Sequence, residues 1–332
     1  MLVYTVRRIL ILIPLLFVIS VITFVLIQLP PGDYLTLYIM QLEAAGTTVA
    51  EEEVEMLKRV FGLDKPMHVQ YFIWLRRILI YHDFGRSFQF QAPVSELLAD
   101  RVPLTVAVSL ATTVFVFMVA VPIGILSATN QYSLLDYFWT FVGFIGISVP
   151  SFLLALVALW IAFKQFNMSA IGLFSPEYMD AAWSWGKVVD LFKHLWIPVV
   201  IIGMAGTASL IRTMRGTLLD ELRRQYVITA RSKGLPEIRN LIKYPVRTAI
   251  NPIISTIGWL LPGIISGEVL VSMVMNIPTT GPLLLTALLN QDMYLAGSIV
   301  LILSCLTVIG TLISDILLTW LDPRIRFESI AP

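Results

Sequence analysis

Six long apolar stretches constrain this chain more than any other feature, because each is long enough to cross a lipid bilayer. They cover residues 9–29, 103–128, 137–163, 195–212, 253–275 and 294–320. About 20 apolar residues in a helix span the ~30 Å hydrocarbon layer, and a helix satisfies its own backbone hydrogen bonds there. The stretches do not alternate apolar and polar residues as barrel strands do. We therefore predict an all-α polytopic membrane protein with about six transmembrane helices.

Composition agrees with a membrane protein and limits its partners. Only 14% of the 332 residues are charged, whereas a soluble domain carries roughly 25%. The formal net charge is +1, so no nucleic-acid partner is expected, and the lipid bilayer is the expected surrounding. The first apolar stretch is longer than a signal-peptide core of roughly 7–15 residues and ends in "QLPPGD". We therefore expect a retained helix.

The distribution of Lys and Arg predicts which ends of the spans face the cytoplasm. Arg7 and Arg8 precede the first span, and Arg324 and Arg326 follow the last. The segment 213–252 holds eight basic residues against three acidic ones. Basic residues are enriched in cytoplasmic loops, so we place this segment and both termini in the cytoplasm.

These assignments divide the chain into four parts. The parts are residues 1–29 (N-terminus and first span), 30–102 (a small external domain), 103–320 (five further spans, with the cytoplasmic loop 213–252) and 321–332 (a cytoplasmic tail). The external segment contains a predicted amphipathic helix over 48–62, which begins with a capping-box pattern. A second helix is predicted after Pro66. Arg76 and Arg77 interrupt it, so we interpret it as an interfacial or domain helix and not as a seventh span.

The basic loop contains the stretch "YVITARSKGLPEIRNLIKYPVRTAINP" at 226–252. Gly234 interrupts a helical pattern and Pro236 can begin a new helix. Ile238 and Ile242 then fall on one apolar stripe. The pattern predicts a helix, a glycine turn and a short amphipathic helix whose stripe must be covered by lipid or by a partner protein.

This stretch resembles the cytoplasmic coupling loop of binding-protein-dependent ABC importer permeases. That loop has a Glu-Ala-Ala core with a glycine four residues after the second alanine. Here Ile228, Thr229 and Ala230 take the core places and Gly234 takes the place of the glycine. The core glutamate is absent, and the distal Leu-Pro of the pattern is replaced by "VR".

The resemblance extends along nearly the whole chain. "VRRILILIPLLFVISVITFVLIQLPPGD", "FGLDKPMHVQYFIWL", "DFGRSF", "SVPSFLLAL" and "LDPRIRF" follow one another in the order found in dipeptide, oligopeptide and nickel permeases of the B type. The chain is thus similar to a type I ABC importer permease. The resemblance implies a multi-pass protein of a bacterial or archaeal plasma (inner) membrane.

The resemblance also implies a division of labour between subunits. The chain would form half of a pore with a homologous second permease subunit, two cytosolic ABC ATPases would dock on the coupling loops, and an external binding protein would deliver substrate. The chain has no G-x-x-x-x-G-K-[ST] motif, so we expect no ATP hydrolysis and no cofactor in it. The residues implied in ATPase coupling are Tyr226, Thr229, Ala230, Arg231, Lys233, Gly234, Leu235 and Pro236.

A carboxylate within the fifth span is the main candidate for a role in the membrane. Glu268 is costly at that depth unless it faces water or a partner, so it either lines the pore or bonds another helix. Gly263 and Gly267 form a G-x-x-x-G pattern, which allows close helix packing or a pore-facing position. The other candidates for the substrate path are Ser148, Ser151 and Ser272.

The substrate stays open between oligopeptides and oligosaccharides. Ser272 and Met273 stand where peptide-type permeases have Glu-Thr, and "NIPTTGP" replaces their "PGxG" turn. These departures resemble the family branch that carries oligosaccharides. An ATP-independent channel or secondary transporter is the alternative function, although it would predict inverted repeats and more intramembrane charges. We find no constellation of a catalytic or metal site.

Overall fold

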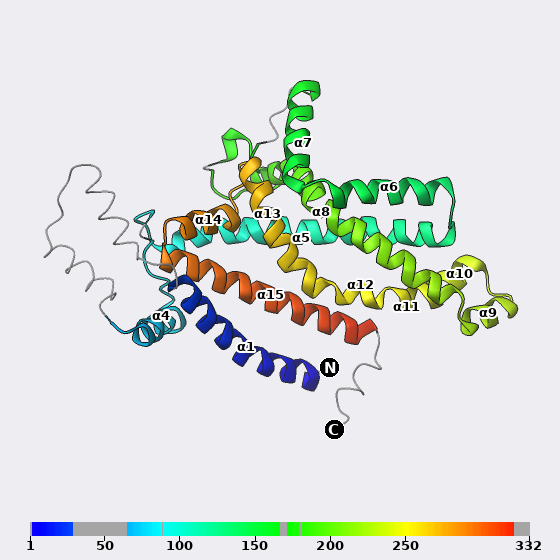
Figure 1. The fold of residues 1–332 in the computed structure, drawn as a ribbon, viewed down its shortest axis with the longest axis horizontal. Helices are drawn as coiled ribbons and strands as arrows, with labels where there is room; N and C mark the ends of the chain where they lie inside the picture. The colour runs from blue at the N-terminus through cyan, green and yellow to red at the C-terminus, as the bar shows by residue number, and fades with distance from the viewer. Residues whose placement is uncertain (1, 29–64, 88, 167–170, 180, 322–332) are drawn as a thin grey trace, which may run out of the picture. The chain divides into compact units, whose positions relative to one another are not determined.

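The computed structural model describes residues 2–28, 65–87, 89–166, 171–179 and 181–321 (Figure 1). Its elements are α1 (Leu2–Gln28), α4 (Met67–Tyr81), α5 (Val94–Thr129), α6 (Leu134–Ser148), α7 (Ser151–Phe166), the 3-10 helix η1 (Pro176–Tyr178), α8 (Trp185–Leu222), α9 (Gln225–Ser232), α10 (Glu237–Leu241), the π-helix η2 (Ile242–Val246), α11 (Arg247–Ala249), α12 (Asn251–Ser255), α13 (Ile257–Val274), α14 (Thr280–Leu289) and α15 (Met293–Leu321). Within these ranges the only β-type pairing is an isolated bridge between Arg86 and Pro93. The predicted all-α class is confirmed.

Most of the predicted spans are present as long apolar helices. Among the described residues, α1, α5, α8 and α15 are each long and apolar enough to cross a membrane. The predicted stretches 9–29, 103–128, 195–212 and 294–320 fall on these four helices. The stretch 253–275 falls on α12 and α13.

The apolar stretch predicted as a span over 137–163 contains Pro150, which favours a kink at that point. The structure breaks this stretch into α6 and α7, which are bent by 106°. Pro150 follows the break and Val149 is extended (φ −94°, ψ 125°). Proline lacks a backbone N–H and disfavours a helical conformation in the residue before it, so the helix ends at Ser148. The bent pair still qualifies as one broken span.

The chain forms two compact units. Unit 1 consists of residues 1–8, 104–278 and 307–332, and unit 2 consists of residues 9–103 and 279–306. The predicted boundary between the external segment and the core, at 102/103, falls inside α5, which already begins at Val94. Within the segment 30–102, α4 follows Pro66 as predicted. The predicted helix over 48–62 lies outside the described residues.

In unit 2, one buried carboxylate fixes the "DFGRSF" loop. Asp292 is fully buried and accepts hydrogen bonds from the Ser87 hydroxyl (2.5 Å) and the Gln89 N–H (3.1 Å). It also accepts from the N–H of Leu295 in the first turn of α15 (3.2 Å). Gly85 supplies the positive φ of 86° that the loop requires. These hydrogen bonds therefore hold the "DFGRSF" loop against the start of α15.

In unit 1, α5 and α6 pack closely against α8, and glycines allow the approach. A Cβ atom at Gly124 of α5 would lie 2.5 Å from Cβ of Met214 on α8. On α6, a Cβ at Gly143 would lie 3.4 Å from Cβ of Ala208 on α8. Small residues at such contacts let helix backbones come together.

The helical run from Glu237 to Val274 is irregular at its beginning. Pro245 lies within the π-helix η2, where its missing N–H removes one bond of the regular ladder. The run is tied to its neighbours by two side chains. Thr217 of α8 donates to the Ala249 carbonyl (3.2 Å), and Ser314 of α15 donates to the Ile254 carbonyl (2.9 Å).

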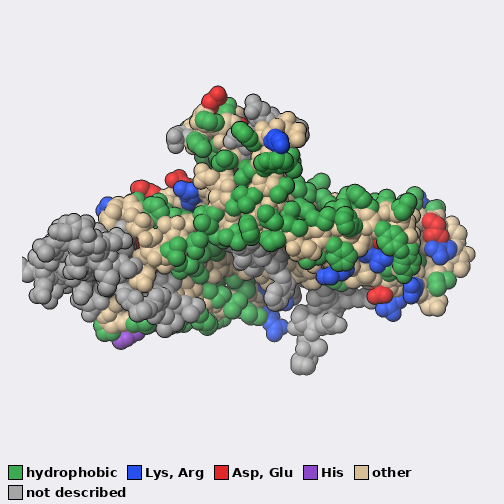
Figure 2. Space-filling model, turned by 45° about the horizontal axis from the view of Figure 1, so that its top comes forward, with side chains coloured by type: hydrophobic (Ala, Val, Ile, Leu, Met, Phe, Trp, Pro, Cys, Tyr) green, Lys and Arg blue, Asp and Glu red, His purple; other side chains and the backbone are tan. Residues whose placement is uncertain are grey.

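The surface agrees with a protein surrounded by lipid. Figure 2 shows hydrophobic side chains over much of the visible face, and a group of charged side chains at the end where α9 and α10 lie. On α6 and α7, Phe141, Phe144 and Trp160 are each more than half exposed. An aqueous surface rarely presents so many large apolar groups together, whereas a lipid-facing surface is expected to do so.

Candidate functional site

The predicted helix, glycine turn and short helix are present as α9, the turn at Gly234, and α10. The N–H of Leu235 donates to the Ala230 carbonyl (3.3 Å), and the N–H of Gly234 donates to the Arg231 carbonyl (2.9 Å). This pair of bonds is a Schellman motif, in which glycine takes the left-handed position after the helix. Gly234 has φ +77°, as the sequence predicts, and a Cβ there would meet no atom within 4 Å.

Two side-chain interactions hold α10 against α9. The Asn240 side-chain amide, which is only 1% exposed, donates to the Val227 carbonyl (3.2 Å). The Arg231 guanidinium binds both oxygens of Glu237, with Nε–Oε1 at 2.6 Å and Nη2–Oε2 at 3.0 Å. The adjacent Arg231 guanidinium lowers the pKa of the Glu237 carboxyl, and Glu237 raises the pKa of Arg231. These two interactions therefore hold α9 and α10 in a fixed arrangement around the Gly234 turn.

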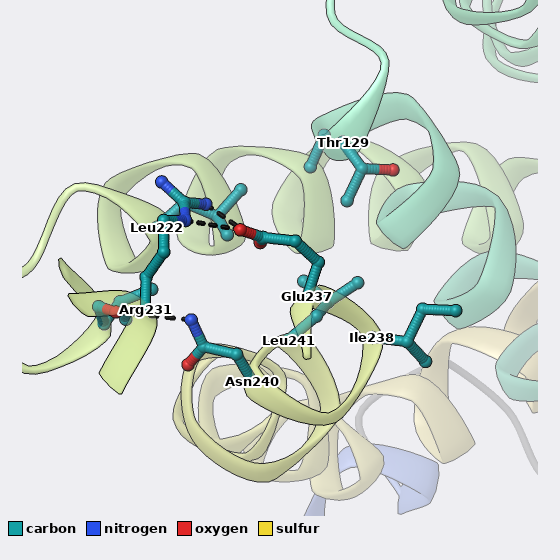
Figure 3. Close-up of a pocket in the computed structure, with 9 residues that line it drawn as sticks. Thr129, Leu222, Arg231, Glu237, Ile238, Asn240 and Leu241 are labelled. Atoms are coloured by element: carbon teal, nitrogen blue, oxygen red, sulfur yellow. Dashed lines mark hydrogen bonds and ion pairs between the residues drawn. The ribbon is translucent and has the colours of Figure 1, made fainter. Parts of the chain in front are cut away.

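A pocket of about 340 Å³ lies between this turn and the ends of two longer helices. It is lined by Ala128, Thr129, Leu222, Val227, Arg231, Glu237, Ile238, Asn240 and Leu241 (Figure 3). The Arg231–Glu237 pair is the charged part of the lining and neutralises itself, while most of the remaining lining is apolar. The pocket therefore suits an apolar group better than an ion.

A side-chain hydrogen bond and an ion pair connect the start of α9 to the end of α8. The Tyr226 hydroxyl donates to the Glu221 carboxylate, and Nε of Arg224 lies 3.7 Å from the other oxygen of Glu221. Burial raises the pKa of Tyr226, and the hydrogen bond to Glu221 raises it further. Tyr226 therefore stays a donor at neutral pH. Only Arg223 and Arg224 separate α8 from α9.

The outward side of this region combines apolar and basic groups. Ile238 and Ile242 are 74% and 62% exposed, and Tyr226 and Ile228 are both about two-fifths exposed. Of the other residues predicted for coupling, Thr229, Arg231, Lys233 and Pro236 are exposed, while Ala230 and Leu235 are half-buried. The predicted coupling residues lie on α9 and in the turn that leads to α10. Their role stays a prediction.

The residues predicted for the substrate path do not form a single cluster in the contacts that the structure gives. Glu268 is 1% exposed and lies on the same face of α13 as Ile264 and Val271, which belong to an apolar core cluster. Ser272, one turn further along, is also buried. Glu268 therefore faces the interior of unit 1.

The other candidates for the membrane interior lie elsewhere. Ser148 is exposed and Ser151 is half-buried, and the two residues flank the bend between α6 and α7. Gly263 and Gly267 lie on α13. The predicted roles of these residues in the substrate path and in packing are not decided by these positions.

The sequence reasoning missed two polar residues that the structure buries. Asp136, at the start of α6, binds Arg215 of α8 through both carboxylate oxygens. Asn240, on α10, is the second, and it is only 1% exposed. A signal for Asp136 was present, because Ser133 three residues earlier caps the helix by accepting from the Asp136 N–H (3.2 Å). No local signal identifies Arg215 as its partner.

Two family models and several known proteins match nearly the whole chain. The family described as "Binding-protein-dependent transport system inner membrane component" matches residues 120–327, and the family of the corresponding N-terminal region matches residues 1–111. The chain is 33% identical over 328 residues to the oligopeptide transport system permease protein AppB of Bacillus subtilis. The alignment covers 98% of this chain and 99% of AppB.

Two further relatives show a similar extent of likeness. A putative peptide permease protein of Brucella suis is 31% identical over 327 residues, covering 98% of this chain and 99% of its own length. The peptidoglycan transport system permease protein YejB of Agrobacterium fabrum is 27% identical over 359 residues, with 98% of both chains covered.

Proposed function

Because the chain belongs to the family of binding-protein-dependent transport system inner membrane components, we propose that its α9–α10 turn is the docking surface for a cytosolic ATPase. The chain is a membrane-spanning permease subunit of an ATP-driven ABC importer and an integral protein of the inner membrane. The alternative of an ATP-independent channel or secondary transporter is therefore dropped. ATP is hydrolysed by two partner ATPases, and a homologous second permease completes the pore.

The observation that carries this proposal is the combination of rigidity and exposure at the turn. The Schellman motif, the Asn240 hydrogen bond and the Arg231–Glu237 pair fix the backbone before any partner arrives. A preordered surface loses less conformational entropy when it binds. Ile238 and Ile242 stay largely exposed, and the space beside Gly234 is open for a partner.

The proposal also implies how the chain is oriented across the membrane. The docking turn and both termini lie in the cytoplasm, in keeping with the excess of Lys and Arg in 213–252. In intact cells, a cysteine introduced at Arg223 should resist an impermeant thiol reagent added outside. Labelling of that cysteine from outside would reverse the orientation.

The cargo that the relatives support best is an oligopeptide, delivered by an external binding protein. The relatives from Bacillus subtilis and Brucella suis carry oligopeptide or peptide transport in their names. The sequence around Ser272 favours an oligosaccharide as the second candidate. Calorimetric titration of the cognate binding protein with a peptide panel and with an oligosaccharide panel separates the two, and binding of oligosaccharides alone would exclude the first.

The decisive test of docking compares two glycines that differ in one property. A Cβ would meet no atom within 4 Å at either Gly216 or Gly234, but only Gly234 has a positive φ. Gly234→Leu should strain the turn and obstruct the partner. Disrupting an interface hot spot typically costs at least ~2 kcal/mol, or about thirtyfold in affinity. Gly216→Leu is the matched control.

The measurement is recovery of the ATPases with the affinity-purified permease complex. Gly234→Leu should insert into the membrane normally but recover little ATPase, whereas Gly216→Leu should recover the normal amount. A lipid-anchoring turn would tolerate leucine or bind headgroups better. Normal ATPase recovery with Gly234→Leu would therefore refute docking at this turn.

A further inference from the structure

A partly buried ion pair joins the cytoplasmic end of α6 to α8 in unit 1. The Asp136 side chain is only 3% exposed and the Arg215 side chain is 28% exposed. Nε of Arg215 donates to Oδ1 of Asp136 (3.0 Å), and Nη2 donates to Oδ2 (2.8 Å). Such a bidentate pair fixes the orientation of both side chains as well as their distance.

The same carboxylate also orders the turn that leads into α6. Oδ2 of Asp136 accepts from the Tyr132 N–H (3.0 Å), and Tyr132 has a positive φ of 63°. A positive φ is unfavourable for a tyrosine and persists only where the surroundings enforce it. Asp136 therefore holds the turn, the start of α6 and α8 together at one point.

Above the ion pair, α6 and α8 remain in close antiparallel contact. A Cβ at Gly143 would lie 3.4 Å from Cβ of Ala208, and one at Gly146 would lie 3.2 Å from the carbonyl oxygen of Met204. As the residue number rises along α6, it falls along α8, so the contact continues from the ion pair almost to the end of α6. Interlocked helices of this kind resist sliding, because close-packed surfaces do not deform continuously.

The two ends of this helix pair lie at places already assigned to function. At one end, α8 leads through Arg223 and Arg224 into α9, which Glu221 straps to it. At the other end, α6 stops at Ser148, where the bend into α7 begins. A displacement of α9 therefore has a direct path to the bend that carries two of the predicted substrate-path residues.

We infer that Asp136 and Arg215 are positioning residues for transport: their ion pair makes α6 and α8 move as one body, so that movement of the docked ATPase reaches the α6–α7 bend. The inference rests on the proposed docking at α9. Neither residue touches the cargo or the nucleotide. The pair acts by preventing the start of α6 from separating from α8.

The test measures movement at the bend in the complete transporter. Ser148→Cys is introduced together with Cys305→Ser, because Cys305 is the single native cysteine. The rate of reaction with a fluorescent maleimide is compared without nucleotide and after trapping the ATPases with Mg·ATP and vanadate. The unmodified ion pair should give a clear difference between the two rates.

Asp136→Asn should abolish most of that difference while basal ATP hydrolysis and ATPase recovery persist. Asp136→Glu, which retains the carboxylate, should keep most of the difference. Arg77→Gln is the control, because Arg77 belongs to an ion pair whose two side chains are both about half exposed (Nε to Asp83 Oδ2, 3.1 Å). It should behave as the unmodified protein does.

Several outcomes would overturn the inference. One is an equal reaction rate at Ser148→Cys in both states of the unmodified transporter, and another is a full difference in Asp136→Asn. If Asp136→Asn does not fold, the same rates are measured in Arg215→Lys, which keeps the positive charge but loses the bidentate geometry. A full difference between the two rates in Arg215→Lys would refute the positioning role. If ATPases fail to co-purify with the unmodified permease, the proposed docking function is what fails.

Discussion

The bundle of α5, α6 and α8 and the α9–α10 turn both depend on glycine, but for different physical reasons. In the bundle, Gly124 is required because a neighbouring helix leaves no room for a Cβ. In the turn, Gly234 is required because its φ is positive, although the space around it is empty. The first glycine serves contact within the chain, and the second leaves a shaped surface free. A glycine in close contact with another helix therefore indicates packing within the chain. A glycine that fixes the backbone of an exposed turn leaves a surface that a partner protein can bind.

The largest effect is expected from filling the bundle. Gly124→Leu would bring the new side chain into Cβ of Met214, which lies 2.5 Å from the position of the added Cβ and cannot swing away. Overpacking of this kind typically costs about 1–3 kcal/mol. The unfolding temperature of the purified permease in detergent should fall clearly. At Gly216, on α8 of the same bundle, an added Cβ would meet no atom within 4 Å. Gly216→Leu should therefore lower the unfolding temperature much less than Gly124→Leu does. Equal unfolding temperatures for the two variants would remove the packing role of Gly124.

An intermediate effect is expected from locking the bundle covalently. A Cβ at Gly143 would lie 3.4 Å from Cβ of Ala208, close to the roughly 3.5–4.5 Å between Cβ atoms in disulfides. Gly143→Cys with Ala208→Cys, in the Cys305→Ser background, should oxidise readily and raise the unfolding temperature. Because α6 and α8 move together, binding-protein-stimulated ATP hydrolysis with a tryptic peptide mixture should be the same before and after reduction. Hydrolysis that stops on oxidation and returns on reduction would mean that α6 slides along α8.

The smallest effect is expected from the exposed ion pair of the turn. Arg231 lowers the pKa of Glu237, so the pair is complete above the ordinary carboxyl pKa and is lost only as the pH falls through the lowered value. ATPase recovery should therefore be constant between about pH 6 and pH 8. Glu237→Gln should reduce recovery less than Gly234→Leu does, because exposed pairs contribute little. A decline of recovery within that pH range would assign the docking contact to another titrating group.

The same contrast explains how much the sequence could predict. The α9–α10 turn was predictable because its determinants are local: Gly234, Pro236 and the apolar stripe lie within a few residues of one another. The membrane-spanning character of α1, α5, α8 and α15 was predictable from apolar length alone. The family resemblance added the expected partners, which no local pattern contains.

The rest depends on register between distant segments. Asp136 and Arg215 are 79 residues apart, and nothing local pairs them. Pro150 predicts a kink within the apolar stretch 137–163, but nothing local predicts that the bend reaches 106°. Glu268 was singled out because a carboxylate is costly within a span, and only the fold shows that it faces the core of unit 1.

The π-helix at Ile242–Val246 has a consequence for how this chain can vary. A π-turn holds one residue more than an α-helical turn, and each residue of an α-helix turns the chain by about 100°. Because the wider turn takes up that residue, the helical phase beyond it stays close to that of an uninterrupted α-helix. Deleting one residue within Ile242–Val246 would let the run close as a regular α-helix, and the side chains from Arg247 onward would keep roughly their present direction relative to α10. Glu268 would stay on the buried face of α13, and Ile238 would stay exposed on α10. A deletion within a regular α-helical part of the run would instead turn every side chain beyond it by about 100°. The π-turn is thus the place in this run where the chain can lose a residue without turning the membrane face away from the docking face.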